Sequence, residues 1–156
     1  MYSPEFVKVD LNQEEHQKSL LNLLDDYMQD EMGMSESMPE HLGPKIINGL
    51  KKHAAYLGFF VCIDDNFVAL ANCNLNFSTW QAKPLINIHD FIVSPNFRNQ
   101  GIGLFLLNEI ANYAAEKGYC RINLEVRYDN YKAQNLYKKA GFSDCHPKNY
   151  FWEKQW

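Results

Sequence analysis

The sequence lacks long hydrophobic runs, a surplus of positive charge and a secretory leader. No apolar segment approaches the length of a membrane-spanning helix. The N-terminal stretch MYSPEFVKVD does not have the basic and then apolar order of a signal peptide. The net charge is −4, and no basic stripe is visible for holding nucleic acid or an anionic membrane. These absences favour a cytoplasmic protein that binds neither a membrane nor nucleic acid.

The chain has only four cysteines, and their spacing does not indicate a metal-binding site. Cys62, Cys73, Cys120 and Cys145 include no C-x-x-C pair, and most of them lie inside apolar runs. Cysteine in such surroundings behaves as a small hydrophobic residue. We therefore expect free buried or half-buried thiols in a reducing compartment and no bound metal.

The composition is that of one folded domain. The chain has 156 residues, of which 46% are hydrophobic and 14% aromatic, so a substantial core can form and disorder is excluded. There is no repeat, linker or low-complexity tract. We expect a single domain over residues 1–156.

Hydrophobic spacing predicts the order of the elements. Residues 11–32 have apolar positions at helical spacing, with Asn12 and Glu15 as a capping box, and a polar loop precedes a short helix at 45–53. Strands are expected at 58–63, 67–77, 84–93 and 120–126, and helices at Ile102–Lys117 and 131–140. Residues 150–156 read as a last strand or a tail. This order predicts an α/β (α+β) fold with a mixed sheet.

The stretch RNQGIG, residues 98–103, joins a predicted strand to a strongly amphipathic helix. Glycine lets a backbone approach an anion closely, and a helix N-terminus presents unpaired N–H groups. A phosphate cradle is one interpretation; a tight turn with glycines needed for packing is the other. The motif is neither G-x-x-x-x-G-K-[ST] nor G-x-G-x-x-G, which argues against the P-loop and dinucleotide folds.

Two motifs together resemble the GNAT superfamily of N-acetyltransferases. R-x-x-G-x-G at 98–103 is similar to the family's loop for the pyrophosphate of acyl-CoA, and NYKAQNLYKKAGF, residues 130–142, to its N-x-x-A-x-x-L-Y-x-x-x-G-F. The resemblance covers residues 58–142. It implies a mostly antiparallel central sheet flanked by helices, with splayed central strands, and acetyl-CoA as cosubstrate. The implied cofactor-binding residues are Phe91, Ile92, Val93, Arg98, Asn99, Gln100, Gly101, Ile102, Gly103, Asn130, Ala133 and Tyr137.

The resemblance also implies the chemistry. An amine would attack the thioester directly, while a backbone N–H near Phe91–Val93 stabilises the oxyanion and Tyr137 protonates the leaving thiolate. Tyr137 alternatively only packs under the sheet. Asn130 either caps its helix, contacts the pantetheine arm, or does both.

The base is left open between His89, Asp90 and water. The stretch HDFIV is similar to E-D-[FL]-x-V of diamine and polyamine acetyltransferases, with His89 standing where those enzymes carry their basic glutamate. A histidine suits proton removal near neutral pH. Plain strand alternation places His89 on the face of Phe91 and Val93 and Asp90 on the other face, unless a bulge intervenes.

The acceptor is expected to be a small cationic amine. Acids in the N-terminal third would attract it, namely Asp25, Asp26, Asp30, Glu31, Glu36 and Glu40. Candidate residues for lining its pocket are Tyr27, Met34, Phe77 and Trp80, which could equally belong to the core. A protein lysine or N-terminus, and a non-catalytic acyl-CoA sensor, are the alternatives. The family makes a homodimer plausible.

Overall fold

The computed structural model describes residues 3–156, which form five strands, four α-helices and one short 3-10 helix. In chain order these are β1 (Glu5–Lys8), α1 (Glu14–Gln29), α2 (Leu42–Lys52), β2 (Tyr56–Ile63), β3 (Asn66–Ser78), β4 (Lys83–Val93), η1 (Pro95–Phe97), α3 (Ile102–Glu116), β5 (Ile122–Leu124) and α4 (Tyr131–Lys139).

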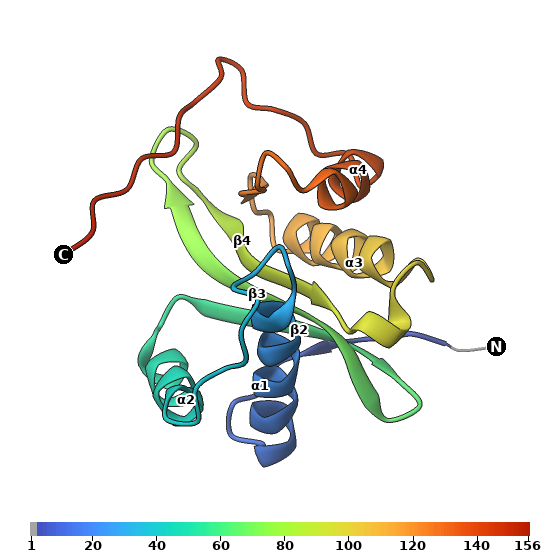
Figure 1. The fold of residues 1–156 in the computed structure, drawn as a ribbon. Helices are drawn as coiled ribbons and strands as arrows, with labels where there is room; N and C mark the ends of the chain where they lie inside the picture. Colours follow the sequence, from blue (N-terminus) through green and yellow to red (C-terminus); the bar gives the residue numbers. More distant parts are fainter. Residues whose placement is uncertain (1–2) are drawn as a thin grey trace.

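The strands make one mixed sheet in the order β1-β2-β3-β4-β5. Neighbouring strands from β1 to β4 are antiparallel, and β5 pairs with β4 in parallel. Helices cover both faces, with α1 and α2 on one side and α3 and α4 on the other (Figure 1). The predicted fold class, a mostly antiparallel sheet between helices, is confirmed.

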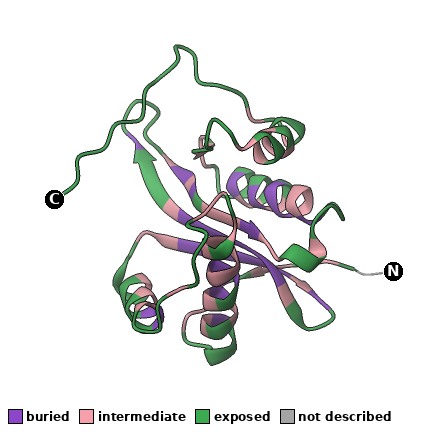
Figure 2. Cartoon of the chain, viewed as in Figure 1, coloured by how far each residue is buried: buried purple, intermediate pink, exposed green. Residues whose placement is uncertain are grey.

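Each face of the sheet has its own core. Strand alternation sends successive side chains to opposite faces, so Phe59 and Phe60, both fully buried, belong to different clusters. Phe59 packs toward α3, where Leu106 and Ile110 are also inaccessible, while Phe60 packs toward α1 beside Leu20. Figure 2 shows the buried positions concentrated along the strands and the inner sides of α1 and α3.

Several predicted details are wrong. Strand β1 was not anticipated, because four residues outside a long periodic segment carry little signal; it forms by pairing with β2. The capping box is absent, since α1 is preceded by Gln13 without a side-chain cap, and the Asp10 carboxylate accepts from the Asn12 N–H instead. Of the two alternatives given for residues 150–156, a strand or a tail, the structure has the tail. Their aromatic side chains, Tyr150, Phe151, Trp152 and Trp156, are exposed.

Other details agree with the prediction. Gly118 and Gly141 take positive φ of 71° and 90° just after α3 and α4, where they end the helices. The four cysteines are free thiols, although Cys145 is exposed rather than buried. Within residues 3–156, none of the helices combines the length and apolar character needed to cross a bilayer.

Phe60 offers a test of the core beneath α1. We expect Phe60→Ala to lower the free energy of unfolding by about 3–5 kcal/mol, the usual range for deleting a buried aromatic ring. The matched control is Phe77→Ala, because Phe77 is 62% exposed on the same sheet, and it should change that free energy by less than about 0.5 kcal/mol. Urea unfolding followed by fluorescence measures both; equal losses would contradict the assignment of Phe60 to the core.

Candidate active site

Strand β4 carries an irregularity at His89. Asn72 of β3 pairs with Asp90, whereas the next residue, Cys73, pairs with Ile88, so His89 is an extra residue in β4. A β-bulge of this kind changes the parity of a strand. Ile88, before the bulge, and Phe91, after it, both pack on the α3 side of the sheet. Asp90 lies between them on the side of α1 and α2.

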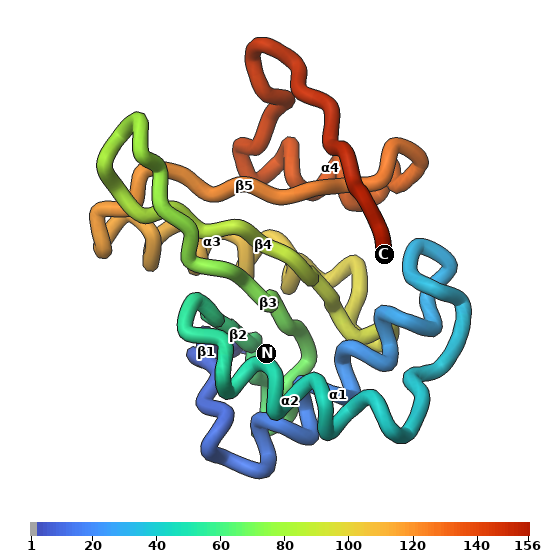
Figure 3. The backbone as a smooth tube through the Cα atoms, turned by 90° about the vertical axis from the view of Figure 1, so that its left-hand side faces the viewer, coloured from blue at the N-terminus to red at the C-terminus, as the bar shows by residue number. Residues whose placement is uncertain are grey.

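The same place marks the end of the contact between β4 and β5. Their parallel pairing runs only from Ile86↔Ile122 to Ile88↔Leu124. Beyond it the two chains diverge, which Figure 3 shows as a widening gap between β4 and the segment after β5. The predicted splay is present, and its origin coincides with the bulge. Strand β5 itself is shorter than the predicted 120–126 because pairing stops there.

The diverging part of β4 has an open edge. The Ser94 N–H donates to the Val68 carbonyl of β3 at 2.9 Å, so by alternation the polar groups of Val93 and Phe91 point away from β3. The Val93 carbonyl points away from β3 and accepts a hydrogen bond from Arg98 Nε at 3.0 Å. Ile92 has the opposite orientation, with its side chain buried under α1. Phe91 therefore offers a backbone N–H and C=O to the gap.

The RNQGIG loop follows this edge. Asn99 and Gly101 have positive φ of 60° and 80°, and α3 begins at Ile102. The first helical hydrogen bond runs from Phe105 N–H to the Gly101 carbonyl at 2.9 Å, so the preceding amides of the first turn are the unpaired ones. A Cβ added to Gly101 would meet nothing within 4 Å. An accessible helix N-terminus of this form fits a phosphate group.

The two glycines of the loop serve different purposes. Gly101 supplies a left-handed turn, whereas Gly103 allows close packing. A Cβ on Gly103 would lie 2.9 Å from Leu136 Cδ2 and 3.6 Å from both Phe91 and Val93. The packing interpretation therefore holds at Gly103, whereas the phosphate cradle at the open turn of Gly101 stays a prediction.

Arg98 connects the loop to α1 rather than standing alone at a rim. Its guanidinium contacts Asp30 with 2.8 Å between Nη1 and Oδ2. The pKa of Asp30 is lowered first by the Met32 N–H, which donates to its carboxylate at 2.9 Å, and then by Arg98. Gln100 turns its amide to the Asn96 carbonyl.

Tyr137 lies next to the open edge. Its ring makes an edge contact with Phe91 at 6.0 Å between centroids and a tilted contact with Phe142, also at 6.0 Å. Burial, followed by the nearby Tyr27, raises the pKa of Tyr137 to about 12. The raised pKa keeps the hydroxyl protonated throughout the neutral range, where it can donate a proton.

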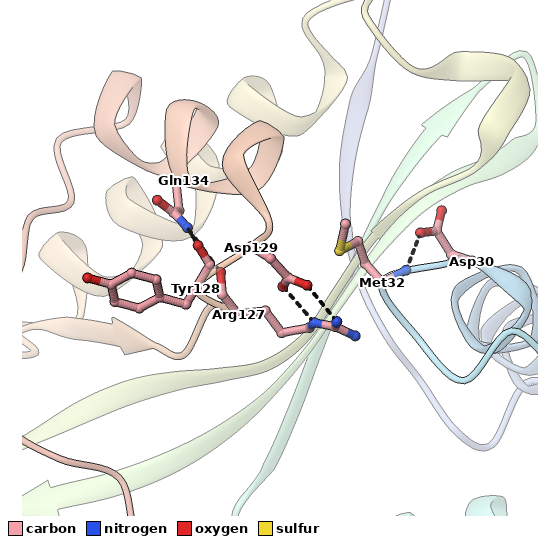
Figure 4. A network of polar contacts seen from close by, with 6 residues as sticks. All are labelled: Asp30, Met32, Arg127, Tyr128, Asp129 and Gln134. Atoms are coloured by element: carbon pink, nitrogen blue, oxygen red, sulfur yellow. Dashed lines mark hydrogen bonds and ion pairs between the residues drawn. The ribbon is translucent and has the colours of Figure 1, made fainter.

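Asn130 has the capping role. Its Oδ1 accepts from the Ala133 N–H at 3.1 Å, which begins α4 and so places Tyr137. Just before it, Arg127 pairs with Asp129 through two hydrogen bonds, and Gln134 donates to the Arg127 and Tyr128 carbonyls. Figure 4 shows Arg127 extending toward the segment with Met32 and Asp30.

A cavity of about 290 Å³ lies on the other side of β4, between the sheet and helices α1 and α2. Its polar lining residues are His89, Asp90, Asn72, Asn74, Tyr27 and Tyr56. The bulge thus brings both candidate bases to one cavity, contrary to the plain alternation expected from the sequence. His89 is exposed at its rim, and Asp90 is half-buried.

A hydrogen-bonded row holds Asp90 in place. Tyr56 donates to Asn72 Oδ1 at 2.8 Å, and Asn72 Nδ2 donates to Asp90 Oδ2 at 3.0 Å. Asn72 is 5% exposed. Sequence reasoning missed Asn72 and Tyr56, because only the register of β2, β3 and β4 brings the three together. A polar residue at the centre of the apolar run FVALANCNLNF was the available signal.

Only some of the residues predicted for the acceptor site lie at the cavity. Tyr27 and Met34 line the cavity, whereas Phe77 and Trp80 are exposed on the β3–β4 hairpin. None of the six N-terminal acids is among the lining residues. Two of them have structural partners: Asp25 accepts from the Met38 N–H at 2.6 Å, and Asp30 pairs with Arg98.

Comparison with known proteins decides the family. The sequence profile described as the acetyltransferase (GNAT) family matches residues 18–142. The chain belongs to this family. The resemblance carried by the two motifs is therefore confirmed. A solved structure described as a probable acetyltransferase superposes with a TM-score of 0.82 at 21% identity, covering 97% of this chain and 98% of that one.

Curated relatives match over shorter stretches. An uncharacterised N-acetyltransferase of Methanocaldococcus jannaschii is 35% identical over 89 residues, 56% of this chain. A thialysine N-epsilon-acetyltransferase of Bos taurus is 36% identical over 69 residues, 44% of this chain. In both cases the aligned part spans 39% of the relative's length. An aminoglycoside acetyltransferase from a soil metagenome, solved with sisomicin, has a TM-score of 0.78 at 16% identity, covering 97% of this chain and 96% of that one.

Packing at Gly103 predicts a stability effect. Gly103→Leu should lower the free energy of unfolding by about 1–3 kcal/mol, because the new side chain overlaps Leu136 and forces α4 away from α3. Gly49→Leu is the control: Gly49 is an exposed position of α2 with open space around its Cβ. At Gly49 the substitution should raise the free energy of unfolding by up to about 1 kcal/mol, because leucine has a higher helix propensity than glycine. Thermal or urea unfolding compares them, and a Gly103→Leu protein as stable as wild type would refute the close approach.

Proposed function

We propose that the protein is an acetyl-CoA-dependent N-acetyltransferase that acts on the primary amine of a small cationic molecule. The observation that carries the proposal is the position of the open edge of β4. It lies between an accessible helix N-terminus on one side, a cavity containing a carboxylate on the other, and a protonated tyrosine beside it. Family membership supports the same conclusion.

The cosubstrate would bind along this edge. The amides at the start of α3, in Gly101, Ile102 and Gly103, suit its pyrophosphate, because they are unpaired and stand at the positive end of the helix dipole. The N–H and C=O of Phe91 suit the amides of the pantetheine arm. Asn99 and Gln100 form the turn that brings the two parts together.

The reaction is an acyl transfer. The amine lone pair forms a C–N bond to the thioester carbonyl, and the nitrogen then releases its extra proton to solvent. The C–S bond breaks, and the sulfur leaves with the bonding electrons. A backbone N–H at the open edge would stabilise the negative charge on the carbonyl oxygen. The Tyr137 hydroxyl then gives its proton to the thiolate, and solvent restores it.

The amine must first lose a proton, since a primary ammonium has no lone pair to attack with. His89 and Asp90 both line the cavity beside the edge, so either one could accept this proton directly or through water. The Asn72 amide, by donating to one Asp90 oxygen, fixes the carboxylate and leaves its second oxygen to face the amine.

The cofactor site is tested by a charge placed on Gly101. Gly101→Asp should weaken acetyl-CoA binding by about 10³-fold, since like charges about 4 Å apart near a surface repel by roughly 4 kcal/mol. Gly101→Asn has the same size and the same tolerance of positive φ without the charge, so it should retain most of the affinity. Titration calorimetry measures both, and equal affinities in the two variants would reject the phosphate assignment.

The acid is tested by Tyr137→Phe. This variant keeps the ring contacts with Phe91 and Phe142 but removes the proton donor, so acetyl-CoA affinity should be unchanged while kcat falls about 10²-fold. Release of the CoA thiol during amine acetylation gives kcat. As a control, Tyr131→Phe changes an exposed tyrosine of the same helix and should leave kcat intact. Full activity in Tyr137→Phe would remove this residue from the chemistry.

A further inference from the structure

The cavity beside β4 has few charged lining residues. Of its lining residues, Asp90 is the one carboxylate, and no lysine or arginine is among them within the described part of the chain. The polar side chains gather at one end, around Asp90, Asn72 and Tyr56. A single ammonium can therefore be neutralised in the cavity, and the place for it is Asp90, one residue from the open edge at Phe91.

The rest of the cavity is apolar. Its lining there consists of Leu24 and Met28 from α1, Met34 from the following loop, and Ile46 and Leu50 from α2. A second ammonium lying against these side chains would lose part of its hydration without gaining a carboxylate. Such a loss costs free energy, and the cost is higher for a charge than for a neutral polar group.

The nearby acids add no second carboxylate to the cavity lining. Asp25 is occupied by the Met38 N–H and the Gln29 amide, and Asp30 by Met32 and Arg98. Asp26 lines a separate hollow on the other side of α1, with Asp65 and Ser94. None of the six N-terminal acids is among the lining residues of the cavity.

The number of charges limits the acceptor as well. A cavity of about 290 Å³ accommodates a short amine with an unbranched or monocyclic apolar stem. An aminoglycoside carries several ammonium groups, more than the single carboxylate of the lining can neutralise.

We propose that the acceptor is a primary amine with one positive charge and a short apolar stem, its ammonium bound by Asp90 and its stem by α1 and α2. This inference rests on the proposed acetyltransferase function and specifies its substrate class. It disfavours diamines and polyamines, whose far ammonium would lie against the apolar lining.

A matched pair of amines tests the inference. Hexylamine and 1,5-diaminopentane have equal chain lengths and differ in whether a methyl or an ammonium stands at the far end. We expect kcat/KM for hexylamine to exceed that for 1,5-diaminopentane by about tenfold or more, which corresponds to roughly 1.4 kcal/mol. Equal values or a preference for the diamine would overturn the inference but support the proposed function. If neither these amines nor spermidine, an aminoglycoside and a basic peptide were acetylated, the proposed function would fail as well.

A designed reversal shows whether the cavity wall sets the preference. Met34→Glu places a carboxylate in the apolar lining, at a side chain that is 63% exposed and outside both cores. It should raise the ratio of diamine to monoamine kcat/KM about tenfold or more. Phe77→Glu is the matched control, since Phe77 is 62% exposed and is not among the lining residues of the cavity. An unchanged ratio in Met34→Glu, or equal shifts in both variants, would contradict the proposed binding mode.

Discussion

The extra residue at position 89 is the constraint on which the candidate site depends. Where β4 accommodates His89, its pairing with β3 shifts register and its pairing with β5 ends. One irregularity thus opens a strand edge toward α3 and α4 and turns Asp90 into the cavity beneath α1 and α2. The bulge is sustained by the long ladder on either side of it, because β3 and β4 pair from Ala69↔Val93 to Ser78↔Lys83.

Two helix starts and one ion pair then hold the parts around the gap. The turn at Gly101 begins α3, and the Asn130 cap begins α4, which places Tyr137 against Phe91. Arg98 bonds to both the Val93 carbonyl and the Asp30 carboxylate, so β4, the loop and the end of α1 meet at one guanidinium. The side expected to take the cosubstrate is thereby connected to the wall of the acceptor cavity.

Much of the fold could be predicted because its signals are local. The helical periodicity of residues 102–117 and the apolar runs of β2, β3 and β4 specify buried faces whatever their partners are. The predicted capping box does not form because Asp10, two residues earlier, accepts the hydrogen bond from the Asn12 N–H. Strand β1 forms through its pairing with β2, and the pattern of a four-residue segment is too short to predict that pairing.

By itself the sequence determined the family motifs, the turn at Gly101, the helix that carries Tyr137 and the excess of negative charge. These depend on residue type and short spacing, which act within one or two turns of the chain. The tertiary structure decided which acids face the cavity, that Asp90 is held through Asn72 and Tyr56, and that Gly103 serves packing. Those outcomes depend on strand register and on the approach of helices distant in sequence, and a one-residue shift at His89 reverses which face a side chain meets.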